Sequence, residues 1–165
     1  ESFSGLNIDL EIIGAGSLRG ELVELARLKN IELRLRDPIP NHQLPLIYNR
    51  FSIYVQPSHL EHHPKTLLEA MASHVPTVQF GIGGTVTFSR DSETSFFVQA
   101  GEKISSRVIY AIEKVGLAAS IAVRAKRLVN TVYNSQNMAE KYSKLYLKGF
   151  LERGTPERVD RFYSK

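Results

Sequence analysis

Apolar residues follow two patterns along the chain. Where they are contiguous or alternate with polar residues, they predict β-strands at 8–13, 31–36, 51–58, 76–80 and 95–99. Where they recur every three or four positions, they predict helices at 18–30, 64–74, 103–115, 117–133 and 135–150, with a helical turn at 41–50. Because strands alternate with helices, the predicted fold class is α/β: a doubly wound parallel sheet with helices on both faces, followed by C-terminal helices.

The predicted topology directs attention to four turns. In open parallel sheets, ligands bind outside the carboxyl ends of the strands, where the strands pass into loops and helices. We therefore expect binding residues in the turns that follow strands, at 14–17, 37–41, 57–64 and 81–87.

The composition suits one globular domain, because 42% of the 165 residues are hydrophobic and 23% are charged. We place this domain at 1–150 and expect a polar, irregular tail at 151–165. No apolar run predicts a membrane span, and the absence of cysteine excludes disulfides and thiolate metal sites. The net charge is +4, and basic residues gather near the C-terminus. We interpret them as solvated helix faces rather than as a nucleic-acid-binding surface.

The turn IIGAGSLRG is the first candidate for a binding site. Gly14 and Gly16 lie between a strand and a helix, where glycine lets the backbone approach a phosphate and helix N–H groups can face it. With Gly20 the spacing is one residue longer than the dinucleotide fingerprint, and Asp37 follows the next strand. A nicotinamide-binding protein is therefore one alternative, and a turn that binds no ligand is another.

The turn HLEHH offers His59, Glu61, His62 and His63 as polar side chains. Imidazole and carboxylate are zinc ligands, but the helical H-E-x-x-H spacing is missing and adjacent histidines point in different directions. We therefore favour polar lining of a cleft over a metal site.

The segment EHHPKTLLEAMASHVP, at 61–76, contains two carboxylates around a proline and an apolar run. If its helix starts at Pro64, Glu69 lies in the second turn. A surface Lys65–Glu69 ion pair is one hypothesis, worth roughly a few tenths of a kcal/mol, but it leaves Glu61 unexplained. In the alternative, free N–H groups at the helix start hold a phosphate, Glu69 accepts two ribose hydroxyls and Glu61 faces the group beyond the phosphate.

In the context P-S-x-x-E-x-x-P-x-x-x-L-E-A-M-A-x-x-x-P, Glu61 and Glu69 resemble the E-x7-E signature of the family 4 retaining glycosyltransferases. IIGAGSLRGEL resembles the strand, G-x-G turn and helix of that family, and NHQLPLIYNRFSIYVQPS the stretch that leads to its site. GIGGTVTFSRDSETSFFVQAGE is similar to its glycine-pair loop and the following strand. The resemblance covers roughly residues 8–150, and several motifs in one register are more specific than any single motif.

The resemblance implies the GT-B architecture, in which two Rossmann-like domains enclose a cleft. The C-terminal domain binds a sugar nucleotide, and the N-terminal domain mostly binds the acceptor. The resemblance is to the C-terminal domain alone, so it implies a fragment that lacks the N-terminal acceptor domain and the first strand of the C-terminal domain, which carries an Arg and a Lys for the diphosphate. An isolated fragment is expected to be inactive, because catalysis needs a cleft closed by both domains.

The implied reaction is transfer of a hexose from a nucleoside-diphosphate sugar to a saccharide or lipid-linked acceptor, with retention at the anomeric carbon. Such enzymes need no metal and no other cofactor. The expected location is the cytoplasm, and peripheral contact with the inner face of the membrane is an open alternative. No nucleic-acid partner is expected.

The resemblance also implies roles for individual residues. Glu61 would be the catalytic group, because it would contact the donor sugar's hydroxyls and its charge suits a cationic sugar in the transition state. Glu69 would hold the ribose, and the backbone of His62 and His63 would line the sugar site. The other implied donor-binding residues are Lys65 and Thr66 at the diphosphate, Asp37 and Ile39 beside the base, and Gly14 and Gly16 near the nucleotide.

The sequence departs from the family's pattern in three places. The glycine–aromatic pair usual after the first glutamate is His62-His63, and the small residue usual before VP is His74. The glutamate usual three residues after Gly84 is Thr87. The departures at His62-His63 and Thr87 favour a second hypothesis, a non-catalytic GT-B-like binding module. The sequence leaves the sugar, the base and the acceptor open.

Overall fold

The computed structural model describes residues 8–153, with side chains described up to residue 150. The described residues divide into two compact units, and the boundary between Arg127 and Leu128 lies inside a helix. Of the polar tail predicted at 151–165, residues 154–165 lie outside the described residues. The domain boundaries stay a prediction.

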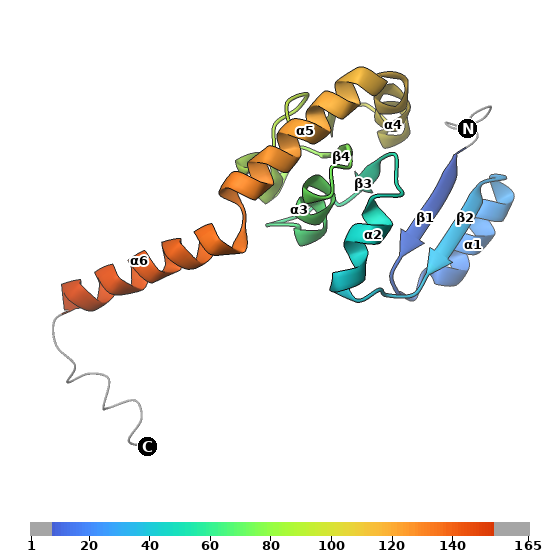
Figure 1. Ribbon diagram of the computed structural model, residues 1–165. Helices are drawn as coiled ribbons and strands as arrows, with labels where there is room; N and C mark the ends of the chain where they lie inside the picture. Colours follow the sequence, from blue (N-terminus) through green and yellow to red (C-terminus); the bar gives the residue numbers. More distant parts are fainter. Residues whose placement is uncertain (1–7, 154–165) are drawn as a thin grey trace, which may run out of the picture. The chain divides into compact units, whose positions relative to one another are not determined.

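The five described strands form two sheets in which every pair is parallel (Figure 1). The first sheet pairs β1 with β2, and the second has the order β3-β4-β5. Each strand lies inside a segment that the hydrophobic pattern predicts as a strand. Their bounds are β1 Asp9–Ile13, β2 Glu32–Arg36, β3 Tyr54–Gln56, β4 Thr77–Phe80 and β5 Phe96–Val98.

Helices connect and follow the strands, so the predicted α/β class, with parallel strands and helices on both faces, is confirmed. No helix within residues 8–153 is long and apolar enough to cross a membrane. The α-helices are α1 Arg19–Leu28, α2 Leu44–Tyr48, α3 Lys65–Ala72, α4 Ile104–Glu113, α5 Val115–Val132 and α6 Ser135–Arg153, and the 3-10 helices are η1 Asn41–Gln43 and η2 Gly83–Thr87.

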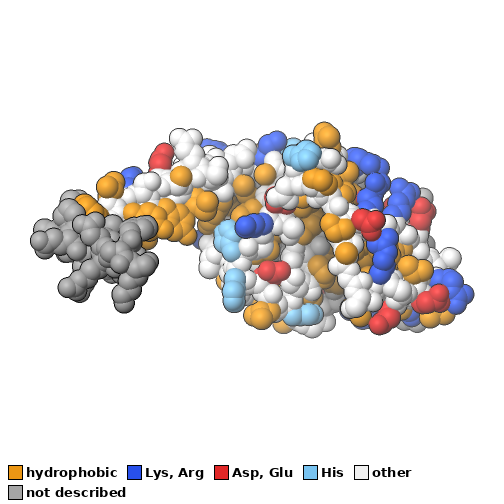
Figure 2. All heavy atoms as spheres, turned by 90° about the horizontal axis from the view of Figure 1, so that it is seen from below, with side chains coloured by type: hydrophobic (Ala, Val, Ile, Leu, Met, Phe, Trp, Pro, Cys, Tyr) orange, Lys and Arg blue, Asp and Glu red, His pale blue; other side chains and the backbone are white. Residues whose placement is uncertain are grey.

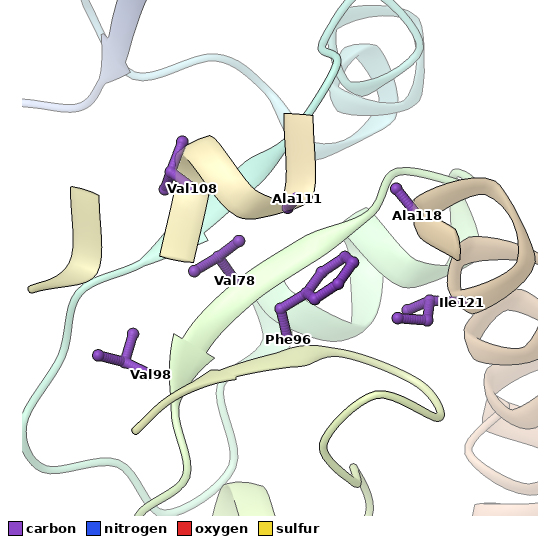
Figure 3. Packing of buried hydrophobic residues seen from close by; sticks show 7 residues of the cluster. All are labelled: Val78, Phe96, Val98, Val108, Ala111, Ala118 and Ile121. Atoms are coloured by element: carbon purple, nitrogen blue, oxygen red, sulfur yellow. The ribbon is translucent and has the colours of Figure 1, made fainter. Parts of the chain in front are cut away.

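The main core lies where α4 and the first turns of α5 pack on β4 and β5 (Figure 3). Val78 of β4 pairs with Phe96 of β5, and both side chains are fully buried. Apolar burial of this kind is the main favourable term in folding, so this cluster fixes β4 and the loops at its ends. Its buried members are Val78, Phe96, Val98, Val108, Ala111, Ala118 and Ile121.

The C-terminal end of α3 is a Schellman motif. The N–H of His74 donates to Met71 O over 3.1 Å, and the N–H of Val75 donates to Ala70 O over 3.1 Å. This arrangement places His74 in the left-handed region, with φ of 64°, where glycine is the favoured residue. The positive φ at residue 74 therefore explains why the family usually has a small residue at this position.

Candidate functional site

The candidate site begins with α3, whose apolar residues anchor it. Leu67, Ala70 and Met71 are fully buried, so the helix is held firmly while Glu69 remains partly accessible. Pro64 has an extended backbone and is the N-cap residue, so the helix begins at Lys65, one position later than predicted. The first N–H groups of a helix have no acceptor within the helix. The N–H groups of Lys65 and Thr66 therefore point out of the N-terminal end of α3.

The glycine-pair loop packs directly on the turn that contains Glu61. The N–H of Gly84 donates to Glu61 O over 2.9 Å. A Cβ at Gly83 would lie 2.2 Å from Glu61 O, and a Cβ at Gly84 would lie 1.4 Å from His62 O. Neither position can therefore carry a side chain without moving backbone. Two motifs that are separate in the sequence, the glycine pair and the E-x7-E segment, meet at this contact.

Glu61 is held by a neighbour that the sequence analysis did not select. Its Oε1 accepts a hydrogen bond from Gln56 Nε2 over 3.0 Å, and the residue is partly buried. No hydrogen bond to Glu61 Oε2 is found among the described residues, so this oxygen can accept one from a ligand. The signal that could have identified Gln56 is its polarity at the end of a strand that is otherwise apolar.

Glu69 contacts a buried tyrosine rather than a lysine. The Tyr48 hydroxyl lies 3.5 Å from Glu69 Oε2 and 3.3 Å from Thr66 O, and it has one hydrogen to donate. Within the described part of the chain, no ion pair joins Lys65 and Glu69, so the surface-pair hypothesis is wrong in this structure. Glu69 instead lies between the buried Tyr48 hydroxyl and the exposed surface of α3.

Two tyrosines interact with the glutamates and have raised pKa values. Burial raises the pKa of Tyr48 well above its usual value, and the charges of Tyr54 and Glu69 add to this shift. Burial also raises the pKa of Tyr54, with further increases from Glu61 and Glu69. Both phenols are protonated at neutral pH, as ordinary tyrosines are, and the raised pKa extends this state to more alkaline pH.

The histidines of the turn lie at the surface. Figure 2 shows histidine side chains exposed on the face that it draws, and His62 and His63 are both exposed. The ring of His63 lies 5.1 Å from that of Phe88, and the ring of His59 stacks on Phe80 at 4.6 Å. An open depression of about 350 Å³ is lined by Leu60, Glu61, His62 and His63.

These histidines and the nearby carboxylates do not gather as metal ligands. Among residues 8–153, no three His, Cys, Asp or Glu side chains are placed to hold one metal ion.

Thr87, which stands where the family usually has a glutamate, makes a hydrogen bond within its own loop. The Thr87 hydroxyl donates to Gly84 O over 2.6 Å. Thr87 thus stabilises the glycine-pair loop and brings no charge to it.

The remaining predicted residues lie at the ends of the β1–β2 sheet. Gly14 has φ of 149°, and its N–H donates to Arg36 O over 3.0 Å. A Cβ at Gly14 or Gly16 would meet no atom of the described residues within 4 Å, so the chain leaves open space beside this turn. Asp37 is exposed and pairs with Arg19 over 3.3 Å. Ile39, two residues further along, is partly buried.

One family model matches most of the chain. The profile of the family described as Glycosyl transferases group 1 matches residues 2–128. Over 151 residues the chain is 25% identical to CapM of Staphylococcus aureus, a capsular polysaccharide biosynthesis glycosyltransferase. This alignment covers 86% of the chain and 38% of CapM, so the chain spans well under half the length of that relative.

Several solved structures share the fold. Sucrose-phosphate synthase from Thermosynechococcus elongatus matches with a TM-score of 0.78 and 19% identity, over 87% of the chain and 39% of that protein. A TarM mutant from S. aureus, in complex with Fondaparinux, alpha-GlcNAc-glycerol and UDP, matches with a TM-score of 0.75 and 21% identity. The match covers 87% of the chain and 30% of TarM. HepE from Anabaena, in complex with UDP-glucose, matches with a TM-score of 0.72 and 19% identity. The match covers 84% of the chain and 42% of HepE.

Proposed function

The chain belongs to the Glycosyl transferases group 1 family, and from this membership we propose that it is the C-terminal, donor-binding domain of a retaining glycosyltransferase. The whole protein would transfer a hexose from a nucleoside-diphosphate sugar to a saccharide or lipid-linked acceptor. An N-terminal acceptor domain of the same protein would complete the cleft.

The observation that carries this proposal is the contact between the glycine pair and the E-x7-E turn. The bond from Gly84 N–H to Glu61 O fixes the turn that presents Glu61, and α3 presents Glu69 in its second turn. Both carboxylates and the free N–H groups at the helix start are thus arranged on one short segment. This order suits a ligand with a phosphate between two hydroxylated groups, because the N–H groups can face the phosphate and each carboxylate can accept from hydroxyls.

Each part of the donor would meet a different group. Glu61 Oε2 would accept from a sugar hydroxyl, since only Oε1 is occupied by Gln56. The N–H groups of Lys65 and Thr66 would face the diphosphate at the positive end of the helix dipole. Glu69 would accept from the ribose hydroxyls. The backbone of His62 and His63, which lines the depression beside Glu61, would flank the sugar.

The second part of the donor site would involve the β1–β2 sheet. The open space beside Gly14 and Gly16 is suited to a nucleotide that approaches the backbone. The turn from Asp37 to Ile39 would flank the base. We propose this assignment from the resemblance, together with the open space around the two glycines.

The proposed chemistry is charge stabilisation. When the bond from the anomeric carbon to the diphosphate oxygen breaks, its electron pair leaves with the diphosphate and the sugar becomes cationic. The start of α3 would stabilise the departing negative charge, and the Glu61 carboxylate would stabilise the positive sugar. Glu61 would not act as a nucleophile. As the resemblance implies, no metal ion or other cofactor would take part.

Proteins of known identity support this choice of partners. The TarM structure holds UDP and the HepE structure holds UDP-glucose. CapM is named for capsular polysaccharide biosynthesis, which supports a saccharide acceptor. We propose a cytoplasmic location or one at the inner face of the membrane, and no nucleic-acid partner.

Thr87 supports a second candidate function, a non-catalytic binding module. The family usually has a glutamate here, whereas the Thr87 hydroxyl is bound to Gly84 O within its own loop. A site without this carboxylate could retain nucleotide and lose turnover.

An activity assay on the protein with both domains separates these candidates. Donor sugars carried by UDP and GDP are incubated with saccharide acceptors, and the configuration of the new glycosidic bond is followed by proton NMR. The proposal expects retained configuration, with activity lost in Glu61→Ala and kept in Glu140→Ala, whose residue is exposed in α6. Inverted product would contradict it. Donor binding without any transfer would favour the binding module.

A further inference from the structure

We propose that Gln56 is a positioning residue that holds the Glu61 carboxylate toward the donor sugar and links it to the start of α3. The inference rests on the proposed function and adds a residue to its site. Gln56 is the last residue of β3 and is only 8% exposed.

The carboxamide of Gln56 is the centre of a small network of hydrogen bonds. Its Nε2 donates to Glu61 Oε1 over 3.0 Å and to Ser58 Oγ over 2.8 Å. Its Oε1 accepts from the Tyr54 hydroxyl over 2.5 Å and lies 3.4 Å from Thr66 Oγ1, which also donates to it. Every polar atom of this buried side chain thus has a partner, as buried polar groups require.

The network fixes which way the amide faces. An ionised carboxylate can only accept hydrogen bonds, so the NH₂ group has to face Glu61 and the carbonyl oxygen has to face the hydroxyls. Tyr54 and Thr66 supply those hydroxyls, and both donate to Gln56 Oε1. The orientation of the Glu61 carboxylate is therefore set from the strand side, and its Oε2 is left for a ligand.

The position of the partners gives the network a functional meaning. Glu61 would contact the sugar, and Thr66 lies in the first turn of α3, where the diphosphate would bind. Gln56 contacts both, so it holds the sugar side and the phosphate side of the donor at a fixed separation. A buried strand end needs no amide for packing alone, because an apolar side chain of the same size would fill the space.

Calorimetric titrations distinguish positioning from general support. UDP and GDP, and the sugar nucleotides UDP-glucose, UDP-N-acetylglucosamine and GDP-mannose, are titrated into the protein with both domains, as wild type and as Gln56→Leu. We expect Gln56→Leu to weaken the tightest sugar nucleotide by about tenfold while the matching diphosphate changes by less than about twofold, since Glu61 loses its hydrogen bond whereas the backbone N–H groups proposed for the diphosphate do not bond to Gln56. Gln56→Glu, which places a second carboxylate beside Glu61, should weaken the sugar nucleotide at least as much.

The chain offers a matched control at another glutamine. Gln99 Nε2 donates to Asp91 Oδ2 over 2.9 Å, so Gln99→Leu removes the same type of bond directly after β5, two strands from Gln56 in the sheet. Gln99→Leu should leave both affinities unchanged. In the double variant Gln56→Leu with Glu61→Ala, the sugar nucleotide should bind no more weakly than in Glu61→Ala alone, since both changes act through one carboxylate.

The contact itself is checked without ligand. The side-chain amide resonances of Gln56 should move in Glu61→Ala and stay in place in Glu140→Ala, as measured by ¹H–¹⁵N NMR. Equal weakening of diphosphate and sugar nucleotide, no weakening of either, or unmoved Gln56 resonances in Glu61→Ala would overturn the inference. If the wild-type protein binds no nucleotide while the Gln56 resonances do move, the proposed function fails and the positioning role fails with it.

Discussion

The N–H of Gly84 donates a hydrogen bond to the carbonyl oxygen of Glu61 over 2.9 Å. This contact joins the loop after β4 to the turn after β3, and it is close enough to leave no room for side chains on the glycine pair. The orientation of Glu61 therefore depends on a residue of another loop as well as on its own segment.

Gly84→Ala should be strongly destabilising. Its Cβ would lie 1.4 Å from His62 O, so the two loops have to separate and the bond to Glu61 is lost. We expect the free energy of unfolding to fall by about 2–4 kcal/mol, as measured by urea denaturation. A fall of less than about 0.5 kcal/mol would show that the loops are not packed as described.

Gly116→Ala is the control for this change. Gly116 lies in the first turn of α5, and a Cβ there meets no atom of the described residues within 4 Å. Because alanine is the better helix former, the same substitution should raise the free energy of unfolding by about 0.5–1 kcal/mol.

His74→Gly should stabilise the chain, because residue 74 has φ of 64° at the C-terminal end of α3. Relief of this left-handed strain outweighs the greater entropy of glycine in the unfolded chain. We expect a gain of about 0.5–1 kcal/mol in the free energy of unfolding. His74→Ala keeps a Cβ and should give no gain. A gain in both variants would mean that the imidazole, rather than φ, is unfavourable.

The stability of the chain should fall at alkaline pH in a way that depends on Tyr48. The unfolded phenol has a pKa of about 10, and burial raises the folded value above it. Above pH 10 the unfolded state therefore loses a proton that the folded state keeps, and stability decreases by up to about 1.4 kcal/mol per pH unit. Below pH 10 both states keep the proton, so the stabilisation from the Tyr48 phenol is fully present.

Urea denaturation between pH 8 and pH 11 measures this effect. Tyr48→Phe should flatten the decline relative to wild type, whereas Tyr146→Phe, at an exposed position of α6, should not. Parallel declines in wild type and Tyr48→Phe would exclude the buried phenol as the cause.

Asp91 should be essential to the loop before β5. Its Oδ1 accepts from Phe97 N–H over 2.8 Å and from Arg107 over 2.7 Å, where the guanidinium is largely buried. Asp91→Ala leaves that cation without its carboxylate, so we expect a loss of about 2–3 kcal/mol in the free energy of unfolding. Glu24→Ala removes an exposed ion pair with Arg27 and should cost under about 1 kcal/mol.

Local patterns predicted the elements of the fold well, because apolar periodicity reports directly on which residues are buried. The strand predicted at 51–58 nevertheless shortens to Tyr54–Gln56, since the hydrogen bonds of a parallel ladder form only where β4 runs beside it. The glycine pair and the two glutamates were also visible as motifs.

The contacts between these motifs could not be predicted, because they join residues that are distant in the sequence. Nothing near Gly84 indicates that its backbone touches Glu61, and nothing near Glu69 indicates Tyr48 as its neighbour. Gln56 was visible only as a polar residue in an apolar strand. Its role depends on four partners that the fold brings together.

The central claim is that α3 holds the nucleotide of a donor, and titration calorimetry of UDP and GDP into the protein with both domains tests it most directly. We predict that the wild-type protein binds one of these nucleoside diphosphates, and that Glu69→Ala weakens its affinity by about tenfold or more while the exposed Glu140→Ala does not. Absence of binding to either diphosphate, or equal affinity in wild type and Glu69→Ala, would contradict the claim.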